Sequence, residues 1–251
     1  MQYVFLTAFG VGGATIIGAL IGFLVGKIPP KWNSIILGFA AGIMLAATVF
    51  GLILPSMDTV GTSGIWITVI GILCGAVFLN LADRFTPHLH NIVGVEHEEH
   101  INNTSMNKVL LFVMAIAIHN FPEGIAAGVA FGTGDMGSAL SVALGIALQN
   151  IPEGMVIISP LILAGVSKPR TLFIASLTGV VEIVGTFIGY FAASISSVML
   201  PFLLAFAGGT MLYVISDEMI PETHSEGSEN GATYSLLIGF CVMLVSSSLI
   251  G

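Results

Sequence analysis

Long apolar stretches alternate with short polar breaks along the whole chain. Glycines, prolines and charged clusters separate eight such stretches, at 3–25, 34–55, 64–83, 107–131, 137–164, 170–193, 199–220 and 232–250. An α-helix needs roughly 20 apolar residues to cross the hydrocarbon core of a bilayer, and each stretch is close to or above that length. The pattern therefore predicts an all-α integral membrane protein whose eight transmembrane helices form a single domain, 1–251.

Composition leads to the same class of protein. Hydrophobic residues make up 55% of the chain and charged residues only 8%. Soluble domains carry about 25% charged residues, so this chain cannot cover a water-exposed surface and most of its exterior must face lipid. The first stretch lacks both a basic leading segment and a small-residue cleavage site, so we interpret it as a retained span rather than a signal peptide.

The positive charges indicate which side of the membrane each connection faces. All six lysines and arginines lie at the connections between spans 1 and 2, 3 and 4, or 5 and 6, namely Lys27, Lys31, Arg84, Lys108, Lys168 and Arg170. Cytoplasmic connections carry an excess of Lys and Arg. We therefore expect both termini outside and the polar, His- and Glu-rich connection 84–106 in the cytoplasm.

One short motif occurs twice. The hexapeptide HNFPEG at 119–124 recurs as QNIPEG at 149–154, and the copies lie near the centres of spans 4 and 5. Consecutive spans are antiparallel, so the two copies are expected to meet near the middle of the bilayer. Pro122 and Pro152 each remove one intrahelical donor and are expected to kink their helices. Irregular helices at this depth are tolerated where they line a cavity or pack against protein.

Three acidic residues, Glu123, Glu153 and Glu182, lie near span centres. A charged residue there costs about 2.5–3.5 kcal/mol on insertion scales. With no Lys or Arg at that depth in the sequence, protons or a metal cation must supply the positive charge.

The spacing of the motif favours a metal. At about 3.6 residues per turn, His119 and Glu123 lie on one helix face, as do Gln149 and Glu153. The two motif asparagines, Asn120 and Asn150, lie on the adjoining edges. Mixed nitrogen and oxygen ligands suit Zn²⁺, Fe²⁺, Mn²⁺ or Cd²⁺. The sequence therefore predicts a transition-metal site at the bilayer midplane and a protein that moves the ion.

Several alternatives remain open at this point. The motif side chains could serve only to form interhelical hydrogen bonds that hold spans 4 and 5 together. The same ligands would serve a passive metal channel, and His and Glu one turn apart also occur in zinc hydrolases, which makes an intramembrane metalloenzyme a rival. A transporter of protons or small solutes would show no dependence on metal.

Other candidate residues lie away from the two motifs. Met44 could add a thioether at the centre of span 2, and Asp58 is a candidate entrance residue at its outer end. Seven residues near the cytoplasmic ends are candidates for a metal exit: Asp83, His88, His90, Asp217, Glu218, Glu222 and His224. Connection 84–106 adds His97 and His100, and 221–231 is expected to be a loop.

The combination of these segments resembles the ZIP (Zrt-, Irt-like protein) family of metal-ion transporters, prokaryotic members above all. The resemblance rests on HNFPEG and QNIPEG, on GFAAGIMLAATVFGLILPSMD at 38–58, on DRFTPHLH at 83–90, on Glu182 and on SDEMIPETH at 216–224. It implies two inverted three-helix repeats, spans 1–3 and 6–8, around spans 4 and 5. It also implies uptake of Zn²⁺, or of Cd²⁺, Fe²⁺ or Mn²⁺, into the cytoplasm by alternating access.

The resemblance carries further expectations about partners and ligands. It implies a homodimer in a prokaryotic cytoplasmic membrane that is a transporter and not an enzyme, with no organic cofactor and no nucleic-acid partner. The primary metal site would consist of Met44, His119, Glu123, Gln149 and Glu153. An adjoining second site would consist of Asn120, Glu123, Asn150, Glu153 and Glu182, with the shared glutamates as bridges.

The chain departs from the family pattern at two positions. Asn150 stands where some relatives carry Asp, and an amide holds a cation less tightly than a carboxylate. Asp217 stands where a His-Glu pair is common, which changes the exit ligands without removing them.

Overall fold

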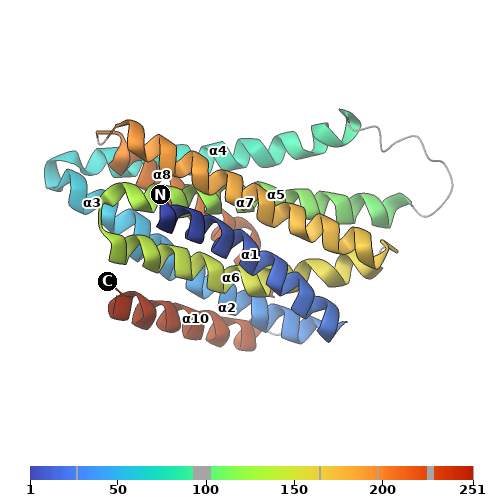
Figure 1. Ribbon diagram of the computed structural model, residues 1–251. Helices are drawn as coiled ribbons and strands as arrows, with labels where there is room; N and C mark the ends of the chain where they lie inside the picture. The colour runs from blue at the N-terminus through green and yellow to red at the C-terminus, as the bar shows by residue number, and fades with distance from the viewer. Residues whose placement is uncertain (27, 93–102, 164, 197, 225–228, 251) are drawn as a thin grey trace.

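The structure, a computed structural model, describes residues 1–26, 28–92, 103–163, 165–196, 198–224 and 229–250. Within these ranges every regular element is a helix (Figure 1), which confirms the all-helical prediction. Ten α-helices are present there: α1 Gln2–Val25, α2 Pro30–Thr48, α3 Leu54–Val60, α4 Ile65–Ile92, α5 Asn103–Ala130, α6 Met136–Leu163, α7 Lys168–Ile195, α8 Leu200–Val214, α9 Ile220–His224 and α10 Glu229–Ile250.

Short helical segments of other types join some of them. Two π-helical turns, η1 Val49–Ile53 and η5 Ile215–Met219, make α2–α3 and α8–α9 continuous, while η2 Thr62–Gly64 and η4 Phe131–Thr133 are 3₁₀ turns. A π turn inserts an extra residue into an α-helix and is frequent at functional sites.

Seven of the described helical stretches are long and apolar enough to cross a membrane: 2–25, 30–60, 62–82, 136–159, 168–195, 200–224 and 230–250. They correspond to seven of the eight predicted spans, and the remaining one, 107–131, coincides with α5 up to Ala130. The eighth membrane crossing stays a prediction. The protein is therefore an integral membrane protein with a helical bundle.

The predicted connections are wrong at their edges. Helix α4 continues to Ile92 and α5 begins at Asn103, so much of 84–106 is helical. Likewise α9 extends to His224 and α10 begins at Glu229 within the expected loop 221–231. Polar residues mark where an apolar span ends, but a helix satisfies its own backbone and can continue past that point.

The helices pack as two groups. Helices α1, α5, α6 and α7 form one group through extensive α1–α6, α5–α7 and α1–α7 contacts, and α2 with α10 and α4 with α8 form the other. Helices α4 and α10 lie at opposite edges of the bundle, at the top and bottom of Figure 1. Only 22% and 17% of their spans are buried inside the protein, so these two helices present most of their apolar surface to lipid.

Glycines let the helices of one group approach closely. A Cβ on Gly18 of α1 would overlap the carbonyl of Ile151 in α6, and a Cβ on Gly185 of α7 would overlap that of Phe121 in α5. Small residues at such positions are the means by which membrane helices bring their backbones together. The two glycines are 167 residues apart in sequence and make equivalent contacts.

The same spacing recurs in the second group. Gly42 of α2 packs against the carbonyl of Leu236 in α10, and Gly209 of α8 packs against that of Ile72 in α4. The π turns η1 and η5 also occupy corresponding places, and each is followed by a proline, Pro55 or Pro221. Glycines 167 residues apart thus make similar contacts in both groups.

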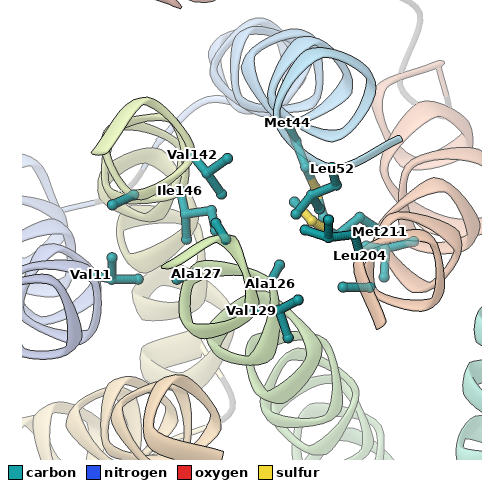
Figure 2. Close-up of a cluster of buried hydrophobic side chains, with 14 of the residues drawn as sticks. Val11, Met44, Leu52, Ala126, Ala127, Val129, Val142, Ile146, Leu204 and Met211 are labelled. Atoms are coloured by element: carbon teal, nitrogen blue, oxygen red, sulfur yellow. The ribbon is translucent and has the colours of Figure 1, made fainter. Parts of the chain in front are cut away.

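Small and large apolar side chains share the contact between the two groups. One buried apolar cluster contains side chains of α5 and α6 on one side and of α2, η1 and α8 on the other (Figure 2). Its alanines are Ala40, Ala41, Ala126, Ala127, Ala130, Ala139, Ala143, Ala193 and Ala207. The same cluster holds larger side chains such as Leu52, Val142 and Met211.

The closest approach in the first group yields a matched pair of substitutions. A Cβ on Gly12 of α1 would overlap the Gly179 carbonyl of α7, whereas a Cβ on the adjacent Gly13 would meet nothing within 4 Å. We expect Gly12→Ala to destabilise the protein by about 1–3 kcal/mol, since the clash involves backbone. Gly13→Ala should leave stability unchanged or slightly higher, because alanine favours helix.

Thermal unfolding of the two purified variants in the same detergent provides the measurement. Equal melting temperatures for Gly12→Ala and Gly13→Ala would contradict the close packing of α1 on α7.

Candidate metal centre

The two hexapeptides lie within continuous helices, since α5 and α6 both extend through their prolines. The polar residues of the motifs project into the bundle. His119, Asn120 and Glu123 on α5, and Gln149 and Asn150 on α6, are at most 4% exposed. Glu153 is partly exposed because it borders a cavity.

A side-chain hydrogen bond joins the two motifs. Gln149 Nε2 donates to Glu123 Oε1 over 2.7 Å, from α6 to α5. The antiparallel spans therefore meet at the same depth, as the motif spacing predicts. The amide is a neutral donor, so it lowers the cost of burying the carboxylate without neutralising its charge.

Several polar atoms around this bond have no hydrogen-bond partner. Among the described residues they include Glu123 Oε2, Gln149 Oε1, Asn150 Oδ1 and both amide atoms of Asn120, all fully buried. Leaving a buried polar atom unpaired costs about 1–3 kcal/mol, so proteins rarely tolerate a group of them without a use. Four of the five are oxygens, the atom type that a hard or borderline cation requires.

Glu182 has a more complete environment. Its side chain is fully buried on α7, and it accepts a short hydrogen bond from Asn150 Nδ2 of α6 and one of 3.2 Å from Thr15 Oγ1 of α1. Asn150 Nδ2 also donates to the Val11 carbonyl of α1 over 3.2 Å. Three helices are thus connected through one carboxylate.

A cavity of about 430 Å³ reaches the centre from one end of the bundle. Its acidic and imidazole side chains are His119, Glu153, Asp217, Glu218 and Glu222, and its apolar walls are Leu37, Val156, Val214, Met219 and Pro221. Two of the predicted midplane residues, His119 and Glu153, therefore border the same space as the predicted exit residues Asp217, Glu218 and Glu222.

His119 and Glu218 form a direct link across this cavity. The distance between His119 Nε2 and Glu218 Oε1 is 2.6 Å, and it joins α5 of one helix group to η5 of the other. Glu218 lies within the π turn η5. In this conformation His119 is held by Glu218, and Glu123 is held by Gln149.

These links keep the predicted ligands apart. Within the described part of the chain, no three His, Cys, Asp or Glu side chains stand close enough together to hold an ion. Met44 is fully buried in the apolar cluster with Leu52 and Met211 (Figure 2), away from the cavity lining. The thioether role of Met44 stays a prediction.

The remaining candidates lie at the ends of the bundle. Asp58 on α3 is exposed. The His224 ring contacts the Ile220 carbonyl at 2.9 Å and the Thr233 hydroxyl at 3.2 Å. The backbone of Asp83, His88 and His90 lies in α4, but their side chains are outside the described residues, and so are His97 and His100 entirely.

Sequence reasoning missed two members of this centre. Thr15 and the Val11 carbonyl lie in the middle of an apolar stretch, where nothing distinguishes them from packing residues. The spacing of 167 residues between Thr15 and Glu182, the same as between the paired glycines, is the signal that could have revealed Thr15.

The fold and the centre define a polytopic helical membrane protein with a buried, acidic, oxygen-rich site open to one end. Comparisons with known proteins give the family. The family model described as ZIP zinc transporter matches residues 86–247. The zinc transporter GufA of Myxococcus xanthus is 44% identical over 246 residues, which cover 96% of each chain.

Two further relatives extend this likeness. The zinc transporter ZIPB of Bordetella bronchiseptica is 36% identical over 95% of this chain and 78% of its own length. The zinc transporter ZupT of Clostridium perfringens is 32% identical over 96% of this chain and 94% of its own. The chain therefore belongs to the ZIP zinc transporter family, a family of transporters rather than enzymes, which removes the metalloenzyme alternative.

The cavity predicts different chemical reactivity for two adjacent residues of α6. Val156 lines the cavity, whereas Ile157 is fully buried on the side that packs against α1 and α7. In a background with Cys74 and Cys241 replaced by serine, Val156→Cys should react with a hydrophilic thiol reagent at least about tenfold faster than Ile157→Cys. The reason is that only a thiol in contact with water ionises and reacts readily.

Mass spectrometry of the labelled protein gives both rates. Equal labelling of the two positions would mean that the cavity does not admit water to this depth.

Proposed function

We propose that this protein carries zinc across the membrane into the cytoplasm, and that the polar centre between α5 and α6 holds the ion during transport. The observation that carries the proposal is the group of buried, unpaired oxygens around Glu123 and Gln149, which adjoins a cavity lined by acidic side chains. The relatives named as zinc transporters indicate the same cargo.

The primary ligands in this proposal are His119, Glu123, Gln149 and Glu153, with Met44 as a further candidate. Imidazole and carboxylate are the ligands that Zn²⁺ prefers when no thiolate is present. To bind, Glu123 must turn from the Gln149 amide and His119 must leave Glu218. Both changes are rotations of side chains that already lie at the centre, and a divalent cation would replace the donors they lose. Cd²⁺, Fe²⁺ and Mn²⁺ remain candidate cargoes on the same ligand chemistry.

The proposal includes an eight-span bundle of two inverted repeats, spans 1–3 and 6–8, around α5 and α6. Three features support it. Helix pair α1–α6 has its counterpart in α7–α5, pair α2–α10 has its counterpart in α8–α4, and the contact glycines are 167 residues apart. Both chain termini lie at the same end of the bundle, at the left of Figure 1, as an even number of spans requires.

Transport in this proposal proceeds by alternating access. The group formed by α1, α5, α6 and α7 would move as a unit against α2, α4, α8 and α10. The alanines in the contact between the groups support such sliding, because each reduces the interlocking of side chains that movement must overcome. The conformation described here would be the one that releases the ion, since the cavity joins His119 and Glu153 to Asp217 and Glu222.

The orientation and assembly also belong to the proposal. In this proposal the cavity end, where the lysines and arginines gather, faces the cytoplasm and both termini lie outside. The membrane would be a prokaryotic cytoplasmic membrane. Trp32 and Trp66 are exposed, and each lies at the start of its span. Because the two spans are antiparallel in this proposal, the two rings would lie at opposite lipid headgroup layers. The homodimer stays a prediction.

The central test is uptake of radioactive zinc into proteoliposomes. Glu123→Ala should reduce the initial rate by more than about tenfold, because losing one charged ligand costs more than the 1.4 kcal/mol that a factor of ten represents. Asp135→Asn is the matched control. Asp135 is an exposed acid that accepts hydrogen bonds from Gly137 N and Ser138 Oγ at the start of α6, and asparagine preserves such a cap.

Uptake by Glu123→Ala at the wild-type rate would contradict the assignment of the metal site to this centre. Unlabelled Cd²⁺, Fe²⁺ and Mn²⁺ added outside would rank the cargoes by competition. Preloading the vesicles with unlabelled zinc separates a carrier from a passive channel, since counterflow accelerates labelled uptake only in a carrier.

Sidedness is testable with single cysteines in the background that lacks Cys74 and Cys241. Asp58 and Glu222 are exposed at the two ends of the bundle. An impermeant maleimide should label Asp58→Cys in intact cells, and Glu222→Cys only after permeabilisation. The reverse pattern would invert the proposed direction of transport.

A further inference from the structure

The polar centre divides into two parts that differ in hydrogen bonding. Around Glu123 and Gln149 several buried oxygens lack partners. Around Glu182 both carboxylate oxygens have donors, Asn150 Nδ2 for Oε1 and Thr15 Oγ1 for Oε2. The first part has unused capacity for a cation, and the second part has already satisfied its acid with neutral donors.

The orientation of the Asn150 amide is determined by its neighbours. Its nitrogen faces two acceptors, the Glu182 carboxylate and the Val11 carbonyl. The amide oxygen could not occupy that place, because it would face two other oxygens with no hydrogen between them. Both amide hydrogens are therefore used within the protein.

The position of Glu182 also indicates that its side chain is engaged within the protein. The carboxylate is fully buried, and neither Glu182 nor Asn150 lines the cavity that reaches His119 and Glu153. Its carbonyl is also covered, because Gly124 of α5 packs directly against it. Glu182 thus contacts α1, α5 and α6 and lies at the middle of the helix group that would carry the ion.

We propose that Asn150 makes this transporter a single-ion carrier, by holding Glu182 in a hydrogen-bonded clamp of α1, α6 and α7 in place of a second metal site. This inference rests on the proposed function. An aspartate at position 150 would offer only acceptors, so it would need a cation between itself and Glu182. The asparagine supplies the hydrogens instead, and Glu182 becomes a positioning residue.

The number of ions at the centre can be measured as the difference in bound zinc per chain between the unmodified protein and its Glu123→Ala variant. Purified full-length protein and its Glu123→Ala variant are equilibrated with zinc, passed through a desalting column and analysed for zinc per chain. Histidines and acids elsewhere bind equally in both, so the difference counts only ions that depend on Glu123. The clamp predicts a difference of one ion per chain.

A difference of two would overturn the single-ion proposal and leave the proposed function intact, because Glu123 would then bridge two ions. A difference of zero, with uptake retained by Glu123→Ala, would overturn the proposed function itself. The two failures are therefore distinguishable.

Asn150→Asp tests the residue directly. Its total zinc per chain should exceed that of the unmodified protein by one ion, since the new carboxylate and Glu182 would share a cation. A total equal to that of the unmodified protein in monodisperse Asn150→Asp protein would overturn the role assigned to Asn150.

The clamp itself has a separate readout that does not depend on zinc. In metal-free protein, Glu182→Ala should lower the melting temperature by about 4 °C or more, because it leaves Asn150 and Thr15 without their acceptor. Glu182→Gln retains an acceptor oxygen and should recover part of the loss, while the exposed Asp58→Ala should have no effect. A melting temperature of Glu182→Ala equal to that of the wild type would overturn the clamp.

Discussion

Acidic side chains buried inside a membrane-spanning bundle are the constraint on which the rest of this structure depends. Glu123 and Glu182 are nearly inaccessible, and Lys31, Lys168 and Arg170, the lysines and arginines whose side chains the structure describes, lie at helix ends. An uncompensated carboxylate at this depth is costly, so each acid requires donors from neighbouring helices. Gln149 provides a donor for Glu123, Asn150 and Thr15 provide donors for Glu182, and each of these bonds crosses from one helix to another.

The supporting helices must approach closely for such short side chains to meet. Glycines supply that closeness, with carbonyls of one helix occupying the place where a Cβ of the next would be. Within the helix group that contains the centre these contacts are tight and specific. Between the two groups the buried cluster combines nine alanines with larger apolar side chains. Glycine contacts with neighbouring backbone are therefore the feature that fixes the helices within the first group.

The two hexapeptides show how a repeated framework produces an asymmetric site. Asn120 and Asn150 occupy equivalent places, yet Asn150 is fully engaged through Nδ2 and Asn120 has no partner for either amide atom. The difference arises in the flanking helices. Position 182 of α7 carries a glutamate, whereas the position 167 residues earlier, in α1, carries Thr15. Glu182 engages Asn150 and so closes the half of the centre around that residue. Thr15, which is small and uncharged, offers Asn120 no such partner, and the half around Asn120 and Glu123 stays open for a cation.

Much of this protein follows from the sequence by itself. The solvent requirements of lipid determine helix number and type, because an apolar stretch of about 20 residues has no other stable form in a bilayer. The register of HNFPEG and QNIPEG then brings Glu123 and Gln149 to one depth, as the hydrogen bond between them bears out. The tertiary structure alone decided which donor serves which acid. The link of His119 to Glu218 depends on a π turn, and the link of Glu182 to Thr15 depends on glycine contacts between distant helices, neither of which has a local sequence pattern. Long-range packing, which local periodicity does not encode, is the physical reason.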